Sequence, residues 1–229
     1  MLIIFDLDDT LIDTSGTLTP FQLKKAFYWL IENGVDFPKP DFALELLLRL
    51  NKAASSAKHA IEEFFEINQI NFSLFDRVCA LVYEDFCEEL EVQSHDMAIE
   101  VLHALRETHK LALVTVGKPE IQFFKMKKAG IHSDVFSKII VTATKDKKNH
   151  YKSLIEEFDM DPADGIVCGD RIAIDLTPAK ELGLTTVQML SGRGVCCVGN
   201  KRDVDFSISH LGEIYKILPQ VSNITSFNR

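Results

Sequence analysis

Three carboxylates crowd the N-terminal end of the sequence, directly after an apolar run. The run LIIF at 2–5 is followed by Asp6, Asp8 and Asp9. Carboxylates brought together at the end of a buried segment repel one another and lose hydration. A bound cation offsets both effects, because its charge then dominates the local field. The opening residues therefore indicate a cation site.

Polar groups also follow later apolar runs, at the place where each run ends. They are Thr115, Asp170, Asp175 and three lysines, Lys145, Lys147 and Lys148. In an open parallel sheet, ligands bind beyond the carboxyl ends of the strands. A cation, a hydroxyl and an ammonium group would then meet carboxylates at one edge. This combination suits phosphoryl transfer, in which the protein mainly positions groups and neutralises oxygen charge.

The elements that must position these groups alternate along the chain. Short apolar runs predict buried strands at 2–5, 111–116, 138–143, 165–168 and 185–190. Helical periodicity separates them at 94–108 (with Ser94 as N-cap), 118–130, 148–158 and 173–182. The runs are continuously apolar, as is typical of strands covered on both faces. The pattern predicts an α/β fold, a Rossmann-like parallel sheet with helices on both faces.

One region interrupts this alternation. Residues 20–92 show apolar side chains at three- and four-residue steps and no convincing strand. We interpret the region as an inserted α-helical cap. The predicted domains are an α/β core of residues 1–14 and 94–229 and a helical cap of residues 15–93.

Composition narrows the partners of the protein. The 229 residues carry a net charge of −9, and no long basic run opposes it, which argues against nucleic acid. No apolar stretch approaches the ~20 residues of a membrane span, and the N-terminus lacks the pattern of a signal peptide. Five cysteines without a C-x-x-C pair indicate reduced thiols. We expect a cytoplasmic protein, monomeric or homodimeric, with no membrane or nucleic-acid partner.

Four segments together resemble the motifs of the haloacid dehalogenase-like (HAD) hydrolase superfamily. They are DLDDT at 6–10, Thr115 at a strand end, a lysine within 145–148, and GDRIAID at 169–175. Each segment is weak alone, but all four occur in order and each follows a predicted strand. The resemblance covers residues 1–14 and about 94–210, and the insertion resembles the helical cap of one large branch of the superfamily.

The resemblance implies roles for individual residues. Asp6 would be the nucleophile that becomes an aspartyl-phosphate. Asp8 would protonate the leaving alkoxide and then activate water. Thr115 and the nearby backbone amides of Val116 and Gly117 would bind phosphoryl oxygens.

A lysine would hold the nucleophile and the phosphate together. The family form commonly has Lys-Pro a few residues ahead of an aromatic residue, and this chain has no proline there. Spacing back from Tyr151 favours Lys145 or Lys147 and leaves Lys148 as a third choice.

The resemblance also implies a Mg²⁺ cofactor. Asp6, the backbone carbonyl of Asp8, and Asp170 would ligate the ion, helped by Asp175. Mg²⁺ prefers a few carboxylates together with water and substrate oxygens. Arg171 follows one of these ligands, and the sequence leaves its role open between the site and the surface.

We therefore expect a Mg²⁺-dependent phosphatase that hydrolyses a small phosphorylated metabolite through an aspartyl-phosphate. A phosphomutase or a phosphonate hydrolase would share the same core motifs. A 2-haloacid dehalogenase is disfavoured, because family members with that chemistry lack the second aspartate, here Asp8. A non-catalytic binding protein would be expected to lack a catalytic group, and only the lysine is ambiguous.

Overall fold

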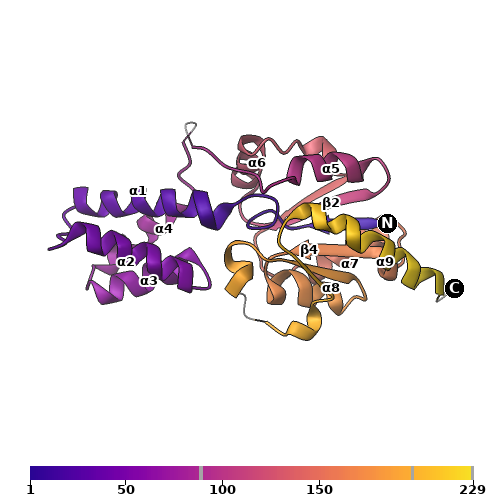
Figure 1. The fold of residues 1–229 in the computed structure, drawn as a ribbon. Coiled ribbons are helices and arrows are strands. Elements are labelled where there is room, and N and C mark those ends of the chain that lie inside the picture. The colour runs from indigo at the N-terminus through magenta and orange to yellow at the C-terminus, as the bar shows by residue number, and fades with distance from the viewer. Residues whose placement is uncertain (88–89, 197–198, 228–229) are drawn as a thin grey trace. The chain divides into compact units, whose positions relative to one another are not determined.

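The chain forms two units, one of which is inserted into the other. In the computed structural model, residues 1–87, 90–196 and 199–227 are described. One unit comprises Met1–Asp13 and Val92–Arg229, and the other comprises Thr14–Glu91. The first is the α/β unit and the second the helical unit (Figure 1).

The α/β unit is built on a six-stranded sheet in which every neighbouring pair is parallel. The strands are β1 (Leu2–Phe5), β2 (Lys110–Val116), β3 (Lys138–Thr142), β4 (Gly165–Gly169), β5 (Thr185–Met189) and β6 (Phe206–Ile208). Their order is β3-β2-β1-β4-β5-β6, so β1 lies in the middle. The order reverses around β1, and ligands of open parallel sheets bind beyond such a point.

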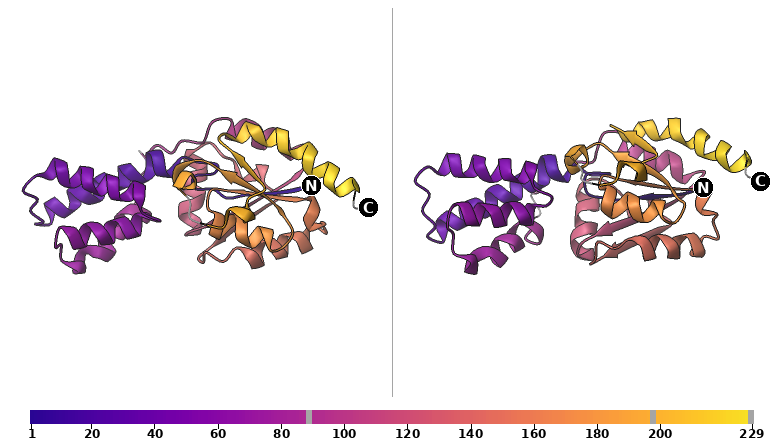
Figure 2. Two further views of the ribbon diagram at one scale, coloured as in Figure 1. Left: turned by 60° about the horizontal axis from the view of Figure 1, so that its bottom comes forward. Right: turned by 90° about the horizontal axis from the view of Figure 1, so that it is seen from below.

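Helices cover both faces of this sheet: α5 (Ala98–Arg106), α6 (Pro119–Lys128), α7 (Lys148–Glu157), α8 (Thr177–Lys180) and α9 (Ile214–Phe227). Tyr151 and Leu154 of α7 and Ala179 of α8 pack against Ile4 and Val114 of the sheet. Figures 1 and 2 show α5 and α9 on the opposite face. The predicted fold class is confirmed.

Local details differ from the sequence-based expectation. Ser94 does not cap a helix: it bridges to Ile12, and α5 begins four residues later at Ala98. Met97, just before that helix, has a φ of 61° and is exposed rather than part of the apolar face. The strand β6 was not anticipated, because its three residues alternate in burial at a sheet edge. The segment 173–182 forms a π-helix, Ile172–Leu176, followed by the short α8.

The helical unit contains η1 (Thr14–Leu18), α1 (Thr19–Glu32), α2 (Pro40–Ala53), α3 (Ala57–Ile67), η2 (Phe72–Leu74) and α4 (Phe75–Tyr83). Aromatic residues form much of its core. The Phe27 and Phe37 rings stack with centroids 4.9 Å apart, and Phe64 lies 5.8 Å from Phe37. Within its described residues the unit has no strand, so burial of these helix faces holds it together.

The two chain segments that lead to the insertion run side by side in the α/β unit. The Asp13 N–H donates to the Gln93 carbonyl, and the His95 N–H donates to the Leu11 carbonyl, both at 2.9 Å. The outgoing segment after β1 and the returning segment before α5 are therefore hydrogen-bonded to each other where the insertion begins and ends.

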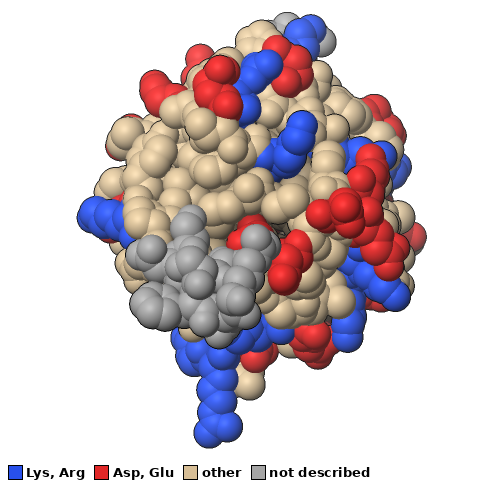
Figure 3. All heavy atoms as spheres, turned by 90° about the vertical axis from the view of Figure 1, so that its right-hand side faces the viewer, with Lys and Arg blue, Asp and Glu red and all other residues tan. Residues whose placement is uncertain are grey.

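Charged side chains are interspersed on the face of the molecule drawn in Figure 3. Lysine and arginine alternate there with acidic and uncharged residues, and the described part of that face carries no continuous basic area. No helix among the described residues is long and apolar enough to cross a membrane.

Candidate active site

The central strand β1 delivers Asp6 to the carboxyl edge of the sheet. The Asp6 N–H donates to the Cys168 carbonyl of β4 at 2.9 Å, so the parallel pairing continues one residue beyond the strand. This contact fixes the backbone from which the carboxylate projects. The Asp6 residue is only 8% exposed.

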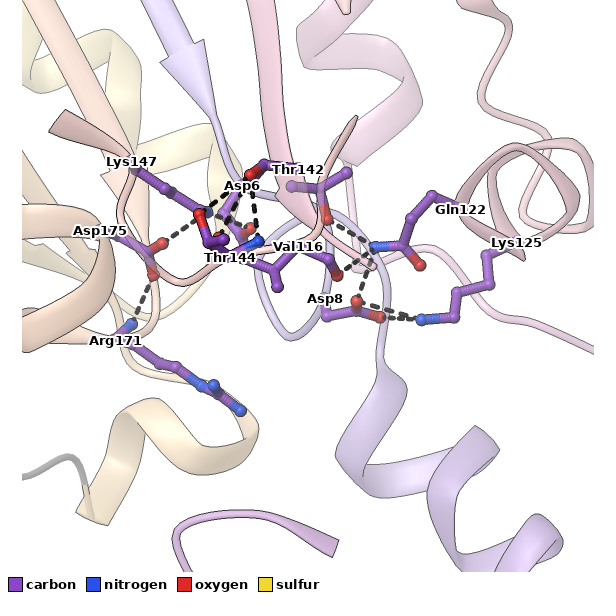
Figure 4. A network of polar contacts seen from close by, with 11 residues as sticks. Asp6, Asp8, Val116, Gln122, Lys125, Thr142, Thr144, Lys147, Arg171 and Asp175 are labelled. Atoms are coloured by element: carbon purple, nitrogen blue, oxygen red, sulfur yellow. Dashed lines mark hydrogen bonds and ion pairs between the residues drawn. The ribbon is translucent and has the colours of Figure 1, made fainter. Parts of the chain in front are cut away.

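Lys147 joins two carboxylates of the site (Figure 4). Its Nζ donates to Asp6 Oδ1 and to Asp175 Oδ1, each at 2.6 Å, and the lysine is 1% exposed. A buried ammonium is tolerable only when carboxylates and hydrogen bonds replace its hydration. Burial opposes the charge of Lys147, but Asp175 and Asp6 outweigh that effect and hold its pKa well above the ordinary value.

The structure distinguishes between the three candidate lysines. Lys145 is exposed, and Lys148 donates to Glu181 on the surface at 2.7 Å. Lys147 precedes Tyr151 by four residues, and the Tyr151 N–H donates to the Lys147 carbonyl. Residues four apart lie on the same side of a helix, so the buried Tyr151 directs Lys147 inward. The structure thus brings Lys147 to Asp6 and leaves Lys145 in solvent.

Asp6, Asp170 and Asp175 form a buried carboxylate cluster. One oxygen from each lies within 4.8 Å of the others. Both oxygens of Asp175 accept hydrogen bonds, Oδ1 from Lys147 and Oδ2 from the Arg171 N–H at 3.0 Å. Asp170 Oδ2, in contrast, is buried and has no hydrogen-bond partner among the described residues. A hard divalent cation such as Mg²⁺ takes oxygen ligands of this kind, so the residues fit the expected ion.

Burial shifts the protonation of these acids. The pKa of Asp6 is raised to about 7, chiefly because burial disfavours the anion; Lys147 opposes the shift, while Asp175 and Asp8 add to it. Burial also raises the pKa of Asp170, with further contributions from Asp175 and Asp6. The ionised cluster therefore needs more positive charge than Lys147 supplies.

Asp175 approaches the strand end closely because Gly169 has no side chain. A Cβ at Gly169 would lie 2.5 Å from Asp175 Cβ and 2.8 Å from its Oδ2. Arg171 is half-buried, and its neighbouring carboxylates, Asp170 first, overcome burial and raise its pKa. Arg171 thus contacts the carboxylate cluster through its backbone N–H, while its guanidinium is directed away from Asp175 (Figure 4).

Gln122 of α6 joins Asp8 to Thr115, and Lys125 of the same helix contacts Asp8. Gln122 Nε2 donates to Thr115 Oγ1 at 2.6 Å and to Asp8 Oδ2 at 3.0 Å. Lys125 Nζ contacts both Asp8 oxygens, at 2.8 and 3.1 Å (Figure 4). Sequence reasoning missed Gln122 and Lys125. The available signal was their position three residues apart in a predicted helix whose inward face they share.

Two further predicted site residues lie beside Thr115. The Val116 carbonyl accepts from Gln122 Nε2 at 3.2 Å. The Gly117 N–H donates to the Thr142 carbonyl at 2.9 Å. This amide, predicted to bind phosphate, is therefore already engaged within the sheet. The hydroxyl of Thr115 accepts from Gln122 and keeps its own proton for another acceptor.

Known proteins resemble this chain over most of its length. A relative from Pyrococcus abyssi named glyceraldehyde 3-phosphate phosphatase is 28% identical over 200 residues, which cover 84% of this chain and 82% of the relative. A protein of the same name from Methanocaldococcus jannaschii is 25% identical over 226 residues, 94% of this chain and 96% of the relative.

Solved structures share the fold. The crystal structure of a predicted phosphoglycolate phosphatase from Haemophilus somnus superposes with a TM-score of 0.68 at 19% identity, covering 94% of this chain and 96% of that one. The family model of the haloacid dehalogenase-like hydrolases matches residues 1–183. The chain therefore belongs to the haloacid dehalogenase-like hydrolases, and the protein is an enzyme of that family.

Proposed function

We propose that this hydrolase is a Mg²⁺-dependent phosphatase that acts on a small phosphorylated metabolite through an aspartyl-phosphate on Asp6. The observation that carries the proposal is the buried contact of Asp6 with Lys147, beside an Asp170 oxygen that has no described hydrogen-bond partner. The phosphatase names of the relatives from Pyrococcus abyssi and Methanocaldococcus jannaschii support the same reaction.

In the first half-reaction, an Asp6 carboxylate oxygen attacks phosphorus, and the bond from phosphorus to the leaving oxygen breaks. Asp8, in its protonated form, donates its proton to that oxygen and becomes a carboxylate, so the alcohol leaves neutral. Lys147 lies against Asp6 and offsets negative charge as the phosphoryl group approaches. The Thr115 hydroxyl donates to a phosphoryl oxygen.

In the second half-reaction, Asp8 removes a proton from water, and the water oxygen attacks the phosphorus of the aspartyl-phosphate. The bond between phosphorus and the Asp6 oxygen breaks, which releases inorganic phosphate and restores the carboxylate. Asp6, Asp170 and Asp175 would hold Mg²⁺ together with the Asp8 carbonyl. When bound, the ion neutralises carboxylate and phosphoryl charge.

The helical unit, Thr14–Glu91, is proposed as the cap that selects the leaving group. The described site residues of the α/β unit supply groups that would bind phosphate and metal. Few of them could recognise the alcohol part of the substrate. We propose that the enzyme acts in the cytoplasm, as a monomer or homodimer, without a nucleic-acid or membrane partner.

The test is phosphate release from a substrate panel by the purified protein, with Mg²⁺ or with excess chelator. The panel contains glyceraldehyde 3-phosphate, phosphoglycolate, hexose phosphates, nucleotides, phosphoserine and a phosphonate. We expect Mg²⁺-dependent release from one class of phosphomonoester and none from Asp6→Asn. Isomerisation of a sugar phosphate, cleavage of the phosphonate alone, or no turnover of any compound would reject the proposal.

A further inference from the structure

We infer that Lys125 and Gln122 are positioning residues that hold the Asp8 carboxylate at a fixed position relative to the phosphate-binding hydroxyl of Thr115. The inference rests on the proposed function, in which Asp8 exchanges protons with the leaving group and with water. It adds two residues of α6 to the machinery of the α/β unit.

The placement of Lys125 is unusual for a lysine. It is 8% exposed, and its neighbour Met126 is 2% exposed, so this part of α6 packs inward. Lysine is almost never buried without a partner. Here the ammonium spans both oxygens of Asp8, at 2.8 and 3.1 Å, which limits rotation of the carboxylate.

Gln122 links the acid to the phosphate-binding side. Its amide nitrogen has two protons and three acceptors within reach: Thr115 Oγ1, Asp8 Oδ2 and the Val116 carbonyl. The glutamine packs over Gly117, where an added Cβ would lie 3.1 Å from its Cδ. Gly117 has a φ of +155°, a value that favours glycine. The local chain therefore leaves room for this side chain.

The arrangement solves a problem of rigidity. Asp8 lies in the turn after β1, whereas Gln122 and Lys125 project from one side of a helix of ten residues. Catalytic groups are held most accurately when regular elements support them. The contacts from Gln122 and Lys125 restrict the motion of the Asp8 side chain, so proton transfer starts from a fixed carboxyl position.

The decisive measurement compares two leaving groups. Alkyl oxygen needs a proton as it leaves, whereas 4-nitrophenolate leaves without one. Both kcat/KM values report the steps up to phosphorylation of Asp6. For Lys125→Met and Gln122→Met we expect kcat/KM for the best alkyl phosphate to fall roughly 10- to 100-fold, the cost of a misplaced catalytic group. The value for 4-nitrophenyl phosphate should stay within about twofold of the wild type, because that step needs no general acid.

The second half-reaction provides an independent readout. Misplaced Asp8 slows water attack for both substrates, so Lys125→Met should show a burst of 4-nitrophenol followed by a slower steady rate. Lys125→Arg retains a cation and should recover part of the alkyl activity. Lys127→Met changes an exposed lysine of the same helix and should match the wild type.

The outcomes separate the inference from the proposed function. Wild-type protein without Mg²⁺-dependent phosphatase activity rejects the proposed function and this inference with it. An active wild type whose Lys125→Met and Gln122→Met variants lose kcat/KM equally for both substrates, or lose none, overturns only the inference. If Lys125→Met fails to fold, Gln122→Met and Lys125→Arg decide, with thermal melting as the check of folding.

Discussion

Two regions of the site pair a carboxylate from the same short segment with a lysine, yet their charge balance differs. In the Asp6 region, one buried ammonium, Lys147, contacts two of three clustered carboxylates. In the Asp8 region, one ammonium, Lys125, spans a single carboxylate. The first region carries excess negative charge, whereas the second is matched by its own cation.

The Asp6 region is also less exposed to solvent than the Asp8 region. The side chains of Lys147 and Asp6 are 1% and 10% exposed, whereas those of Lys125 and Asp8 are 10% and 29% exposed. Charges in the sealed region interact strongly and depend on one another, while water relieves part of any imbalance around Asp8. The clustered carboxylates around Asp6 outnumber the ammonium that contacts them, which favours binding of a cation there, whereas Asp8 already has an ammonium of its own.

The largest effect should come from the nucleophile. Asp6→Asn is nearly isosteric but cannot form an acyl-phosphate, so we expect turnover to fall by more than about a thousandfold. Because the substitution removes one of the crowded anions, metal-free stability should hold or rise. Steady-state phosphate release and thermal melting check the two halves. Ordinary turnover by the variant would refute the nucleophile assignment.

Removing Lys147 should cost more stability than removing Lys125. Lys147→Met leaves buried carboxylates unpaired and should lower the free energy of unfolding by about 3–5 kcal/mol. Lys125→Met leaves a partly solvated carboxylate, for which we expect about 1–3 kcal/mol. Urea unfolding of both variants at one pH gives the comparison. Equal losses would show that the two regions do not differ in the way their burial suggests.

Mg²⁺ should bind in the Asp6 region and not in the Asp8 region, and its binding should stabilise the folded protein. A ligand selective for the folded state adds about 2.7 kcal/mol at a hundredfold excess over its dissociation constant. We expect the melting temperature to rise with Mg²⁺ in the wild type and in Lys125→Met, and to respond much less in Asp170→Asn. Calorimetric titration measures the same binding directly. Melting that ignores Mg²⁺ in the wild type would argue against the site.

Stability should depend on pH through Asp6 in the metal-free protein. The folded-state pKa is raised to about 7, above the ordinary value, so the folded state binds the proton more tightly than the unfolded chain. The resulting stability is fully present below about pH 4 and is lost as pH rises towards 7, at up to about 1.4 kcal/mol per pH unit. Urea midpoints of wild type and Asp6→Asn from pH 4 to 8 isolate this contribution. A difference that does not change with pH would contradict it.

The smallest effect should come from the exposed lysines next to Lys147. Lys145→Met and Lys148→Met should change stability by less than about 0.5 kcal/mol, because exposed charges contribute little. Their phosphatase activity should equal that of the wild type. A large loss of activity in Lys145→Met would return that residue to consideration as the motif lysine.

The sequence alone determined the architecture and the chemical type of the site. Continuous apolar runs predicted five of the six strands, and helical periodicity predicted the insertion. Both patterns are local. A strand buried on both faces is apolar throughout, and a helix buried on one face has apolar residues at three- and four-residue steps. The carboxylates after β1 and β4 were likewise found by their place at strand ends, where a parallel sheet gathers side chains at one edge.

Tertiary structure decided which of several similar side chains face the site. The sequence could not separate Lys147 from Lys145, since the choice depends on how α7 turns its buried Tyr151 face towards the sheet. It also missed Gln122 and Lys125, which reach Asp8 from 114 and 117 residues away along the chain. Contacts between distant segments leave no local pattern, because they arise only when the sheet brings the end of β1 beside α6. Charge balance around each aspartate is a property of that packing and appears only with the folded chain.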